Sequence, residues 1–510
     1  MAGTGLIHGV PGPLTEEERA FRKLQESFAY QYEHIFPDPS LERTVVVLPS
    51  FSLDREVLEK ISGVVHYEER MLCMLLLLRM PRTRVIFVSS SPISDVIIDY
   101  YLHLLPGVPP HHARQRLTLL SAYDGSMVPL SAKILARPRL FERLRAAIPD
   151  PASAHMTCFT VSELERTVAV RLGIPIFGCD PALLHLGTKS GSRILLREAG
   201  VDVPFGYENL GDEQAVAEGL YEMKRRNPAL KRAVVKLNDG FSGEGNAVFH
   251  YEDKKPSVSA IHGALPGLRF EARDMTWEVF LSKIRQMEAV VEELIEGETK
   301  RSPSAQFRVD PLGKVEVIST HDQLLGGSSD QIFLGCQFPA DPAYRLTVQE
   351  IGMRAARAMK EQGVLGRFGV DFVSVHNESG WHHYGIEINL RKGGTTHPYL
   401  MLQFLTDGEY DPVSGTYQTR TGRTCCYYAS DNIEKPGYRG ITPEDLIDVA
   451  VTGGVHFDSA SQQGAVFHMI SALSEFGKLG AVCVGESPEA AGCIYKELVA
   501  VLDRASPEAG

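Results

Sequence analysis

Residues 369–389 read GVDFVSVHNESGWHHYGIEIN and carry the strongest structural signal in the chain. A turn at 378–380 separates two runs of strand-forming residues, which predicts an antiparallel β-hairpin. With the turn placed there, Asp371 lies opposite Glu387, and Asn389 lies two residues further along the same face. Three oxygen-bearing side chains are therefore expected to converge.

This convergence favours a bound cation. Two directly opposed carboxylates repel each other unless a positive charge lies between them, and an all-oxygen ligand set suits Mg²⁺ that is shared with substrate phosphates. The alternative is a solvent-facing polar stripe on the hairpin. Apolar residues on both sides of Asp371 and Glu387 indicate strands that are buried on both faces, which gives the metal site the same weight as the stripe, so both interpretations stay open.

The residues that follow the hairpin are also charged. Arg391 and Lys392 precede Gly393, Gly394 and, a little later, His397. Two cations on a glycine-rich turn beside an acidic site could bind a γ-phosphate or a substrate carboxylate. An ordinary turn is the alternative interpretation.

A third charged position lies upstream. Lys236 interrupts the apolar strand expected at 233–237, and a buried ammonium is costly unless an anion meets it. The glycine-rich residues 238–246 allow backbone N–H groups to approach phosphate oxygens, as in a flap over a nucleotide. A simple hairpin turn is the alternative, because the glycine spacing matches neither a Walker loop nor the GxGxxG fingerprint.

The composition is that of a folded protein. The 510 residues are 44% hydrophobic and 23% charged, which suits about three domains and excludes a disordered chain. A formal net charge of -12 argues against nucleic-acid binding as the main activity. The eight cysteines include no CxxC pair, which indicates reduced thiols and predicts a cytoplasmic protein.

No segment predicts a membrane anchor. The most apolar run, 71–78, is much shorter than the roughly 20 residues that cross a bilayer, and it predicts a buried helix instead. The N-terminus has neither a basic start followed by an apolar stretch nor a small-residue cleavage site, so no secretory signal is expected.

Four regions follow from the order of the patterns, and they predict a multidomain fold of α/β and α+β type. Residues 1–185 read as a Rossmann-like α/β domain with buried parallel strands. Residues 186–300 carry Lys236, residues 301–405 read as an α+β core, and residues 406–510 form an extra C-terminal domain. The expected strands are 44–48, 84–88, 174–177, 233–237, 289–295, 306–309, 315–319, 369–375 and 384–390, and the expected helices are 16–32, 193–199, 348–361, 468–476 and 489–502.

The order of Lys189, Lys236, the acidic strand, Asp371 and the Glu387-Ile388-Asn389 ending resembles the ATP-grasp superfamily over about residues 186–405. The resemblance implies an ATP-grasp fold in which 186–300 form a small, lid-like subdomain and 301–405 form the core with the metal site. It also implies ATP and Mg²⁺, with two ions, as cofactors.

The resemblance implies a role for each matching residue. Lys189 and Lys236 would hold the ATP phosphates, and Asp371, Glu387 and Asn389 would hold the two Mg²⁺ ions. The flap would contribute Ser242, Gly243 and Gly245. The acidic strand would meet the adenine edge through main-chain groups of Glu292, Glu293, Leu294 and Ile295. Glu298 would contact the ribose.

Over the whole chain the sequence is similar to the peptide ligase family of pheganomycin biosynthesis, through short segments at 66–70, 99–102, 186–193, 302–304 and 387–391. This implies an ATP-dependent carboxylate-amine ligase of antibiotic biosynthesis that makes a peptide bond through an acyl phosphate and releases ADP and phosphate. The expected acyl donor is an amino acid or similar small acid, and the expected acceptor is a peptide or amino acid. No nucleic acid or membrane partner is expected, and a homodimer is compatible with this function.

One position departs from the family pattern. ATP-grasp ligases of the D-alanine:D-alanine type carry an arginine two residues before the metal-binding aspartate, where this chain has Gly369. Arg391 and Arg308 are therefore the candidates for the cation that stabilises the transition state. The candidates for the base that deprotonates the amine are His397 and the pair His321-Asp322.

Two other functions stay open at this point. A kinase on the same scaffold would release a phosphorylated product and ADP, and a non-catalytic regulatory protein would bind ATP without hydrolysis. The reaction products distinguish these three functions, since a ligase yields an amide together with ADP and phosphate.

Overall fold

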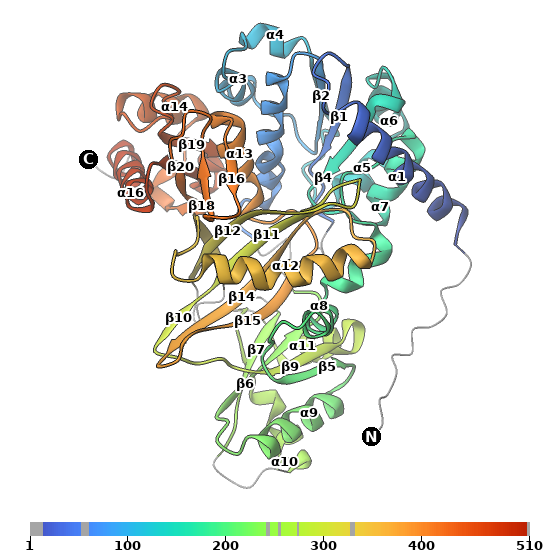
Figure 1. Cartoon of the computed structure of the whole chain (residues 1–510), viewed down its shortest axis with the longest axis vertical. Coiled ribbons are helices and arrows are strands. Elements are labelled where there is room, and N and C mark those ends of the chain that lie inside the picture. Colours follow the sequence, from blue (N-terminus) through green and yellow to red (C-terminus); the bar gives the residue numbers. More distant parts are fainter. Residues whose placement is uncertain are drawn as a thin grey trace.

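A computed structural model describes residues 14–52, 61–240, 245–252, 257–272, 275–326 and 332–506 (Figure 1). Within these ranges the strands form three large sheets and one two-stranded ribbon. In Figure 1 the N-terminal region lies at the upper right, the smaller antiparallel sheet lies at the bottom, and the largest sheet runs between them towards the C-terminal helices at the upper left. This arrangement is the predicted multidomain α/β and α+β fold.

The N-terminal sheet is parallel, with the strand order β3-β2-β1-β4. The strands predicted at 44–48 and 84–88 are confirmed as β1 and β2. The strand predicted at 174–177 is wrong, because only Ile176 forms a bridge to Met156 and the neighbouring Pro175 has no N–H to extend the ladder. The strands are β1 Arg43–Leu48, β2 Thr83–Ser89, β3 Leu117–Ser121 and β4 Ala154–Cys158.

Helices cover both faces of this sheet, since alternate residues of β1 point into two different apolar clusters: Val45 and Val47 into one, Val46 and Leu48 into the other. The predicted helix at 16–32 is confirmed as α1. The buried run at 71–78 lies in a 3₁₀ helix, η1. The helices are α1 Glu16–His34, η1 Val64–Arg79, α3 Asp95–His103, α4 Pro110–Arg114, α5 Leu130–Leu135, α6 Pro138–Ala146, η2 Pro151–Ser153 and α7 Glu163–Leu172.

The smaller sheet is antiparallel and has the order β5-β9-β6-β7-β8. One face packs against α9, α10 and α11 through a shared apolar cluster. The predicted strand at 233–237 is confirmed as β6, and the acidic strand is β9, which ends at Glu293. The elements are β5 Gly206–Leu210, α9 Glu213–Arg226, β6 Arg232–Leu237, β7 Asn246–His250, α10 Val258–Ala264, η4 Leu265–Gly267, β8 Arg269–Phe270, α11 Trp277–Met287 and β9 Ala289–Glu293.

The largest sheet has nine strands and is antiparallel throughout. Its first part contains the predicted hairpin and is covered by α12 and by α8, which follows η3. The helix predicted at 348–361 is confirmed as α12. The elements are η3 Pro181–Gly187, α8 Lys189–Glu198, β10 Thr299–Arg301, β11 Pro303–Val309, β12 Val315–Gly326, β13 Ile332–Phe338, α12 Arg345–Glu361, β14 Gly366–Asn377 and β15 Gly380–Asn389.

The C-terminal region continues this sheet, because β18 pairs with β13 and β20 lies between β18 and β19. The helix predicted at 489–502 is confirmed as α16, whereas His468 ends β19 and the helix predicted from there begins only at Ser471. The elements are α13 Thr396–Thr406, β16 Glu409–Asp411, β17 Thr416–Gln418, β18 Cys426–Glu434, η5 Pro436–Tyr438, α14 Pro443–Thr452, β19 Gly464–His468, α15 Ser471–Phe476, β20 Lys478–Gly485 and α16 Pro488–Ala505.

The two ends of the chain share one apolar core. Val45 of β1 and Leu72 of η1 belong to the same buried cluster as Tyr427 of β18, Leu479 of β20 and Leu502 of α16. Residues 406–510 therefore share a sheet with 301–405 and a core with 1–185. Among the described residues, no helix combines the length and the apolar character that a membrane crossing requires.

Candidate active site

The predicted hairpin is formed by β14 and β15, and the pairing of Asp371 with Glu387 is confirmed. The turn and the register between the turn and this pair differ from the prediction. The turn is tighter, with Asn377 opposite Gly380, and this alone would shift the register by one residue. Ile386 forms a bulge that compensates for the shift, so that Glu387 still faces Asp371.

The three predicted oxygen ligands, Asp371, Glu387 and Asn389, form one group that we call the oxygen cluster. Asn389 Nδ2 donates to Asp371 Oδ2 over 2.8 Å and to Glu387 Oε1 over 3.3 Å. Burial raises the pKa of Asp371, although hydrogen bonds from Ser304 and Gln323 lower it. The cluster thus holds two partly buried carboxylates close together, where a cation would be stabilised.

Lys189 faces the oxygen cluster from the first turn of α8 and forms an ion pair with Glu387. Thr188 caps this helix by accepting a hydrogen bond from the Gly191 N–H over 3.0 Å. Burial, together with the nearby Lys236 ammonium, lowers the pKa of Lys189 to about 7, although Asp371 raises it. The lysine is therefore close to its titration point at neutral pH.

The predicted need of Lys236 for an anionic partner is confirmed. Its ammonium forms an ion pair with Glu292 of the neighbouring strand β9. Arg193 of α8 contacts the other side of the same carboxylate. Glu292 is only 3% exposed, and its two ion pairs join α8 to the smaller sheet.

Two cavities meet at the oxygen cluster, and Asp371 and Glu387 line both of them. The smaller cavity, of about 160 Å³, contains both predicted phosphate-binding lysines, Lys189 and Lys236, and all four residues of the acidic segment that were predicted at the adenine edge: Glu292, Glu293, Leu294 and Ile295. The larger cavity, of about 310 Å³, extends from the oxygen cluster towards η1 and β18.

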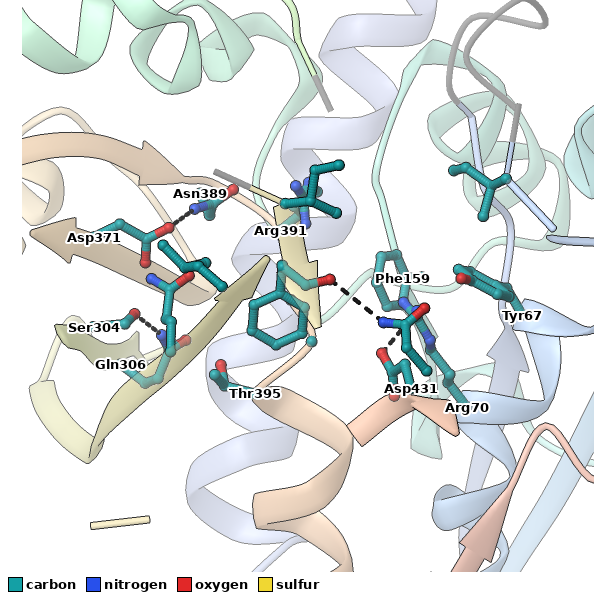
Figure 2. Close-up of a pocket in the computed structure, with 18 of the residues that line it drawn as sticks. Tyr67, Arg70, Phe159, Ser304, Gln306, Asp371, Asn389, Arg391, Thr395 and Asp431 are labelled. Carbon is teal, nitrogen blue, oxygen red and sulfur yellow. Dashed lines mark hydrogen bonds and ion pairs between the residues drawn. The ribbon is translucent and has the colours of Figure 1, made fainter. Parts of the chain in front are cut away.

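Figure 2 shows the larger cavity from the side. Asp371 and Asn389 lie at one end, and Tyr67, Arg70 and Asp431 lie at the other. Arg391 lies between them in this view and also lines the cavity. Burial lowers the pKa of Arg391 to about 10, so its guanidinium stays charged at neutral pH.

Arg308, the other predicted cation, is not brought to this site. It lies four residues along β11 from Ser304, the residue that pairs with Asp371, which corresponds to about 13 Å along the strand. Its guanidinium is instead bound by Glu316, with Nε donating over 3.0 Å. Arg308 is therefore corrected from a candidate catalytic residue to the partner of a carboxylate on β12.

The predicted bases also lie outside both cavities. His397 is buried in a group with Asp431 and His468, in which both imidazole Nε2 atoms contact Asp431 Oδ1, at 3.2 and 2.6 Å. His321 is buried against the Tyr427 hydroxyl at 2.6 Å, and its neighbour Asp322 accepts from the Tyr344 hydroxyl and the Asp341 N–H. Neither histidine is positioned to contact a ligand directly, because protein groups surround both rings.

The group of His397, Asp431 and His468 also has the donor set of a metal centre, since the three ligand atoms lie within 4.8 Å of one another. The Arg70 guanidinium, however, lies 2.8 Å from the remaining Asp431 oxygen. A divalent ion would place further positive charge beside that buried arginine, so we describe the group as a support for Arg70.

The remaining nucleotide predictions divide into three cases. Ser242 and Gly243 lie outside the described residues. Gly245 is described, and its carbonyl accepts from the Leu237 N–H over 3.0 Å, which holds the end of the predicted flap to β6. Glu298 is exposed and does not line the smaller cavity, whereas the nearby Lys300 does.

Several cavity residues were missed by the sequence analysis. Tyr67 and Arg70 lie in a segment that supported the family resemblance, but no role was predicted for them. Gln306, Asp431 and Lys478 were not singled out at all, although all three line the larger cavity. The one usable signal was that charged residues such as Arg70 lie directly before the most apolar run of the chain.

The comparisons with known proteins agree with this geometry. Residues 181–262 and 268–412 match a family model described as IQCH-like, ATP-grasp. The match includes α8, the smaller sheet and the hairpin with the oxygen cluster, so this part of the chain is similar to that family. Residues 445–498 match a second model, described as the PGM1 C-terminal domain.

One relative is similar along almost its entire length. The chain is 29% identical over 476 residues to the L-propargylglycine--L-glutamate ligase of Streptantibioticus cattleyicolor, covering 91% of this chain and 95% of that protein. It is also 21% identical to the IQ motif-containing protein H of Danio rerio over 88% of this chain, but that match spans only 47% of the relative.

Solved structures show the same fold. A biotin carboxylase from Campylobacter jejuni, crystallised as a beta-gamma-ATP complex, aligns with a TM-score of 0.53 over 88% of this chain and 89% of its own. The sequence identity is 14%, so this likeness concerns the fold alone.

Proposed function

We propose that the protein is an ATP-dependent ligase that joins a carboxylate to an amine. The observation that carries this proposal is the position of the oxygen cluster at the junction of two cavities, one rich in features for a nucleotide and the other open to a second ligand. The named activity of the relative that covers almost the whole chain, ligation of two amino acids, supports the same reaction class.

The smaller cavity suits ATP. Lys189 and Lys236 offer ammonium groups for phosphate oxygens. The segment that leaves β9, at Leu294 and Ile295, has main-chain groups that can meet the adenine edge, because the strand ladder ends at Glu293. ATP in this cavity would place its terminal phosphate towards the oxygen cluster.

The oxygen cluster fits Mg²⁺, because two partly buried carboxylates and an amide supply hard oxygen ligands in one place. We propose that Asp371, Glu387 and Asn389 hold two ions. When bound, Mg²⁺ would neutralise negative charge on the phosphoryl group that is transferred.

The reaction needs an activated carboxylate, since oxide is a very poor leaving group. A carboxylate oxygen of the donor attacks the γ-phosphorus, the bond from that phosphorus to ADP breaks, and an acyl phosphate forms. The amine nitrogen then attacks the acyl carbon, phosphate leaves, and the amine loses a proton. Lys189 would orient the phosphate oxygens, and Arg391 in the larger cavity would stabilise the charge that develops on the acyl side.

The test is incubation with ATP, Mg²⁺ and panels of amino acids and short peptides, with the products identified by mass spectrometry. An amide together with ADP and phosphate supports the ligase. A phosphorylated product without an amide would instead identify a kinase, and ATP binding without any turnover would identify a regulatory protein. The same reactions without Mg²⁺ should yield no product.

The acyl donor is proposed to be an amino acid or similar small acid, and the acceptor an amino acid or peptide, in a pathway that makes a peptide natural product. A cytoplasmic location and a homodimer are further proposals from the sequence. Size-exclusion chromatography with light scattering tests the homodimer directly.

A further inference from the structure

The larger cavity has a second charged end, opposite the oxygen cluster. Tyr67 and Arg70 reach it from η1 in the N-terminal region, and Asp431 reaches it from β18 in the C-terminal region. In Figure 2 these three side chains lie together, across the view from Asp371 and Asn389. The cavity is thus built jointly by the ATP-grasp part and by the two ends of the chain.

Arg70 and Asp431 are buried but incompletely satisfied. Their exposed fractions are 5% and 4%, and Arg70 Nη2 lies 2.8 Å from Asp431 Oδ2. Even so, Arg70 Nε and Asp431 Oδ2 have no hydrogen-bond partner among the described residues. A buried donor and a buried acceptor each lose free energy when left without a partner, and here the two residues that carry them line the same cavity.

Surrounding groups hold both side chains in place. The Arg70 guanidinium carbon lies 3.9 Å from the centre of the Tyr67 ring. Asp431 Oδ1 is held by His468 and His397, at 2.6 and 3.2 Å from their Nε2 atoms. The histidine contacts use Oδ1, so Oδ2 has only its ion pair with Arg70 and can accept a further hydrogen bond.

We propose that this end of the larger cavity binds the head group of a free amino acid, with the α-carboxylate at Arg70 and the α-ammonium at Asp431. A guanidinium donates to a carboxylate, and a carboxylate accepts from an ammonium, so the head group of one amino acid offers a partner to each of the two side chains. An acid without an amine would leave Asp431 Oδ2 with only its ion pair to Arg70, and an amine without an acid would leave Arg70 Nε unpartnered. The inference rests on the proposed function for the identity of the cavity as a substrate site.

The head group can belong to either substrate. In an acyl donor, it would be held while a side-chain carboxylate reaches the oxygen cluster. In an acceptor, the amine at Asp431 would be the nucleophile. Oxygen-18 in the carboxylates of the amino acid distinguishes the two, because one donor oxygen leaves with the phosphate, whereas an acceptor transfers none.

The first experiment measures binding rather than turnover. Each of the twenty common L-amino acids is titrated into the full-length protein with ADP and Mg²⁺, and the tightest binder is compared with its α-amide and its N-acetyl derivative. Both derivatives should bind at least tenfold more weakly than the free amino acid. Equal binding of either derivative, or binding of none of the twenty, overturns the proposal.

The second experiment assigns each contact. Arg70→Gln should lose the distinction between the acid and its amide, and Asp431→Asn should lose the distinction between the free and the acetylated amine, while the affinity for ADP stays within twofold. Arg166→Gln is the matched control, because Arg166 is also buried, pairs with Glu17 and does not line this cavity. Unchanged distinctions in both cavity variants contradict the proposal.

The failures can be separated. Amide formation without any dependence on the head group rejects this inference and leaves the ligase intact. Binding that depends on the head group, without amide formation on any panel, rejects the ligase and leaves the amino-acid site. If Arg70→Gln does not fold, the comparison of the three ligands on the wild-type protein decides alone.

Discussion

Glu387 lies between a positive and a negative group, because it forms an ion pair with Lys189 and also faces Asp371. If its carboxylate holds a metal ion during phosphoryl transfer, Glu387→Gln keeps the shape of the side chain but removes the charge. We expect this variant to bind ATP and to form ADP at least about 100-fold more slowly. Chromatographic measurement of ADP, together with titration of a fluorescent ATP analogue, checks both parts.

The control for this prediction is Glu378→Gln, a carboxylate on the exposed turn of the same hairpin. It should leave ADP formation unchanged. Near-normal turnover in Glu387→Gln would remove the basis for the metal site.

From the lowered pKa of Lys189 we expect ATP binding to depend on pH. Because burial lowers its pKa to about 7, the free protein loses the Lys189 proton as the pH rises above 7. Bound phosphates favour the ammonium form, so ATP binding takes up a proton, and the affinity should fall by up to about tenfold per pH unit between pH 7 and 9. Calorimetry at pH 8 in buffers of different ionisation enthalpy measures this uptake.

Lys189→Arg is the matched variant, since arginine keeps its charge throughout this range. Its affinity for ATP should be nearly independent of pH. A wild-type affinity that does not change between pH 7 and 9 would mean that Lys189 is not the phosphate ligand.

The role of a residue could be predicted where its charge or polarity differed from that of its neighbours in the sequence. Lys236 stands in an apolar strand, so its need for an anion could be predicted, and Glu292 meets that need. Arg308 stands two residues from Gln306, which does line the larger cavity, but the sequence does not reveal how far along β11 the cavity extends. Arg70 and Asp431 lie far apart in the chain and meet only through the tertiary fold.

At the scale of elements, the predicted pairing of Asp371 with Glu387 is correct although the hairpin differs from the prediction in two places, whose effects on the register cancel. The turn is shorter than predicted, and the bulge at Ile386 restores the register. Turn length can be estimated from Glu378, Ser379 and Gly380, but a bulge leaves no reliable sequence mark unless a glycine forms it. The strands were therefore predictable, and their detailed course was not.

The start of α8 positions Lys189 and should be sensitive to its cap. Thr188→Ala removes the hydrogen bond to the Gly191 N–H, which should lower the stability of the protein by about 1 kcal/mol. Because the freed helix end also holds Lys189 less firmly, the KM for ATP should rise. Denaturant titration and steady-state kinetics measure the two effects.

Thr188→Ser keeps the hydroxyl group and should restore both properties. A change in stability without a change in KM would show that the cap supports the fold but does not position the lysine.

At the scale of the whole molecule, the C-terminal region is part of the largest sheet rather than an independent unit. A protease recognition sequence inserted after Gly422, in the exposed segment before β18, allows the chain to be cut there. Since β13 pairs with β18 across the cut and both pieces share one core, the two fragments should stay together in native gel filtration. They should separate only in denaturant.

Elution of two native fragments at separate volumes would contradict this expectation. A recognition sequence inserted before α1, in the N-terminal segment, is the control, because cleavage there separates no paired strands of the described sheets.

Four regions were predicted because the periodicities differ along the chain, but the packing of these regions against one another could not be predicted. Apolar runs such as those of η1 and α16 predict that a face is buried, without stating against which partner. The structure joins the first and last regions through one cluster that includes Leu72 and Leu502. For this reason the two charged ends of the larger cavity could not be predicted together.

The place of β20 between β18 and β19 has a consequence for biosynthesis. While the ribosome is still translating the residues before Lys478, β18 and β19 lack the strand that joins them, and Leu72 and its neighbours in η1 lack part of their apolar covering. The apolar residues of the N-terminal region must therefore wait until β20 has been translated before they can bury that surface. Stalled or prematurely terminated translation should therefore yield aggregation-prone intermediates, with exposed apolar surface, that depend on chaperones.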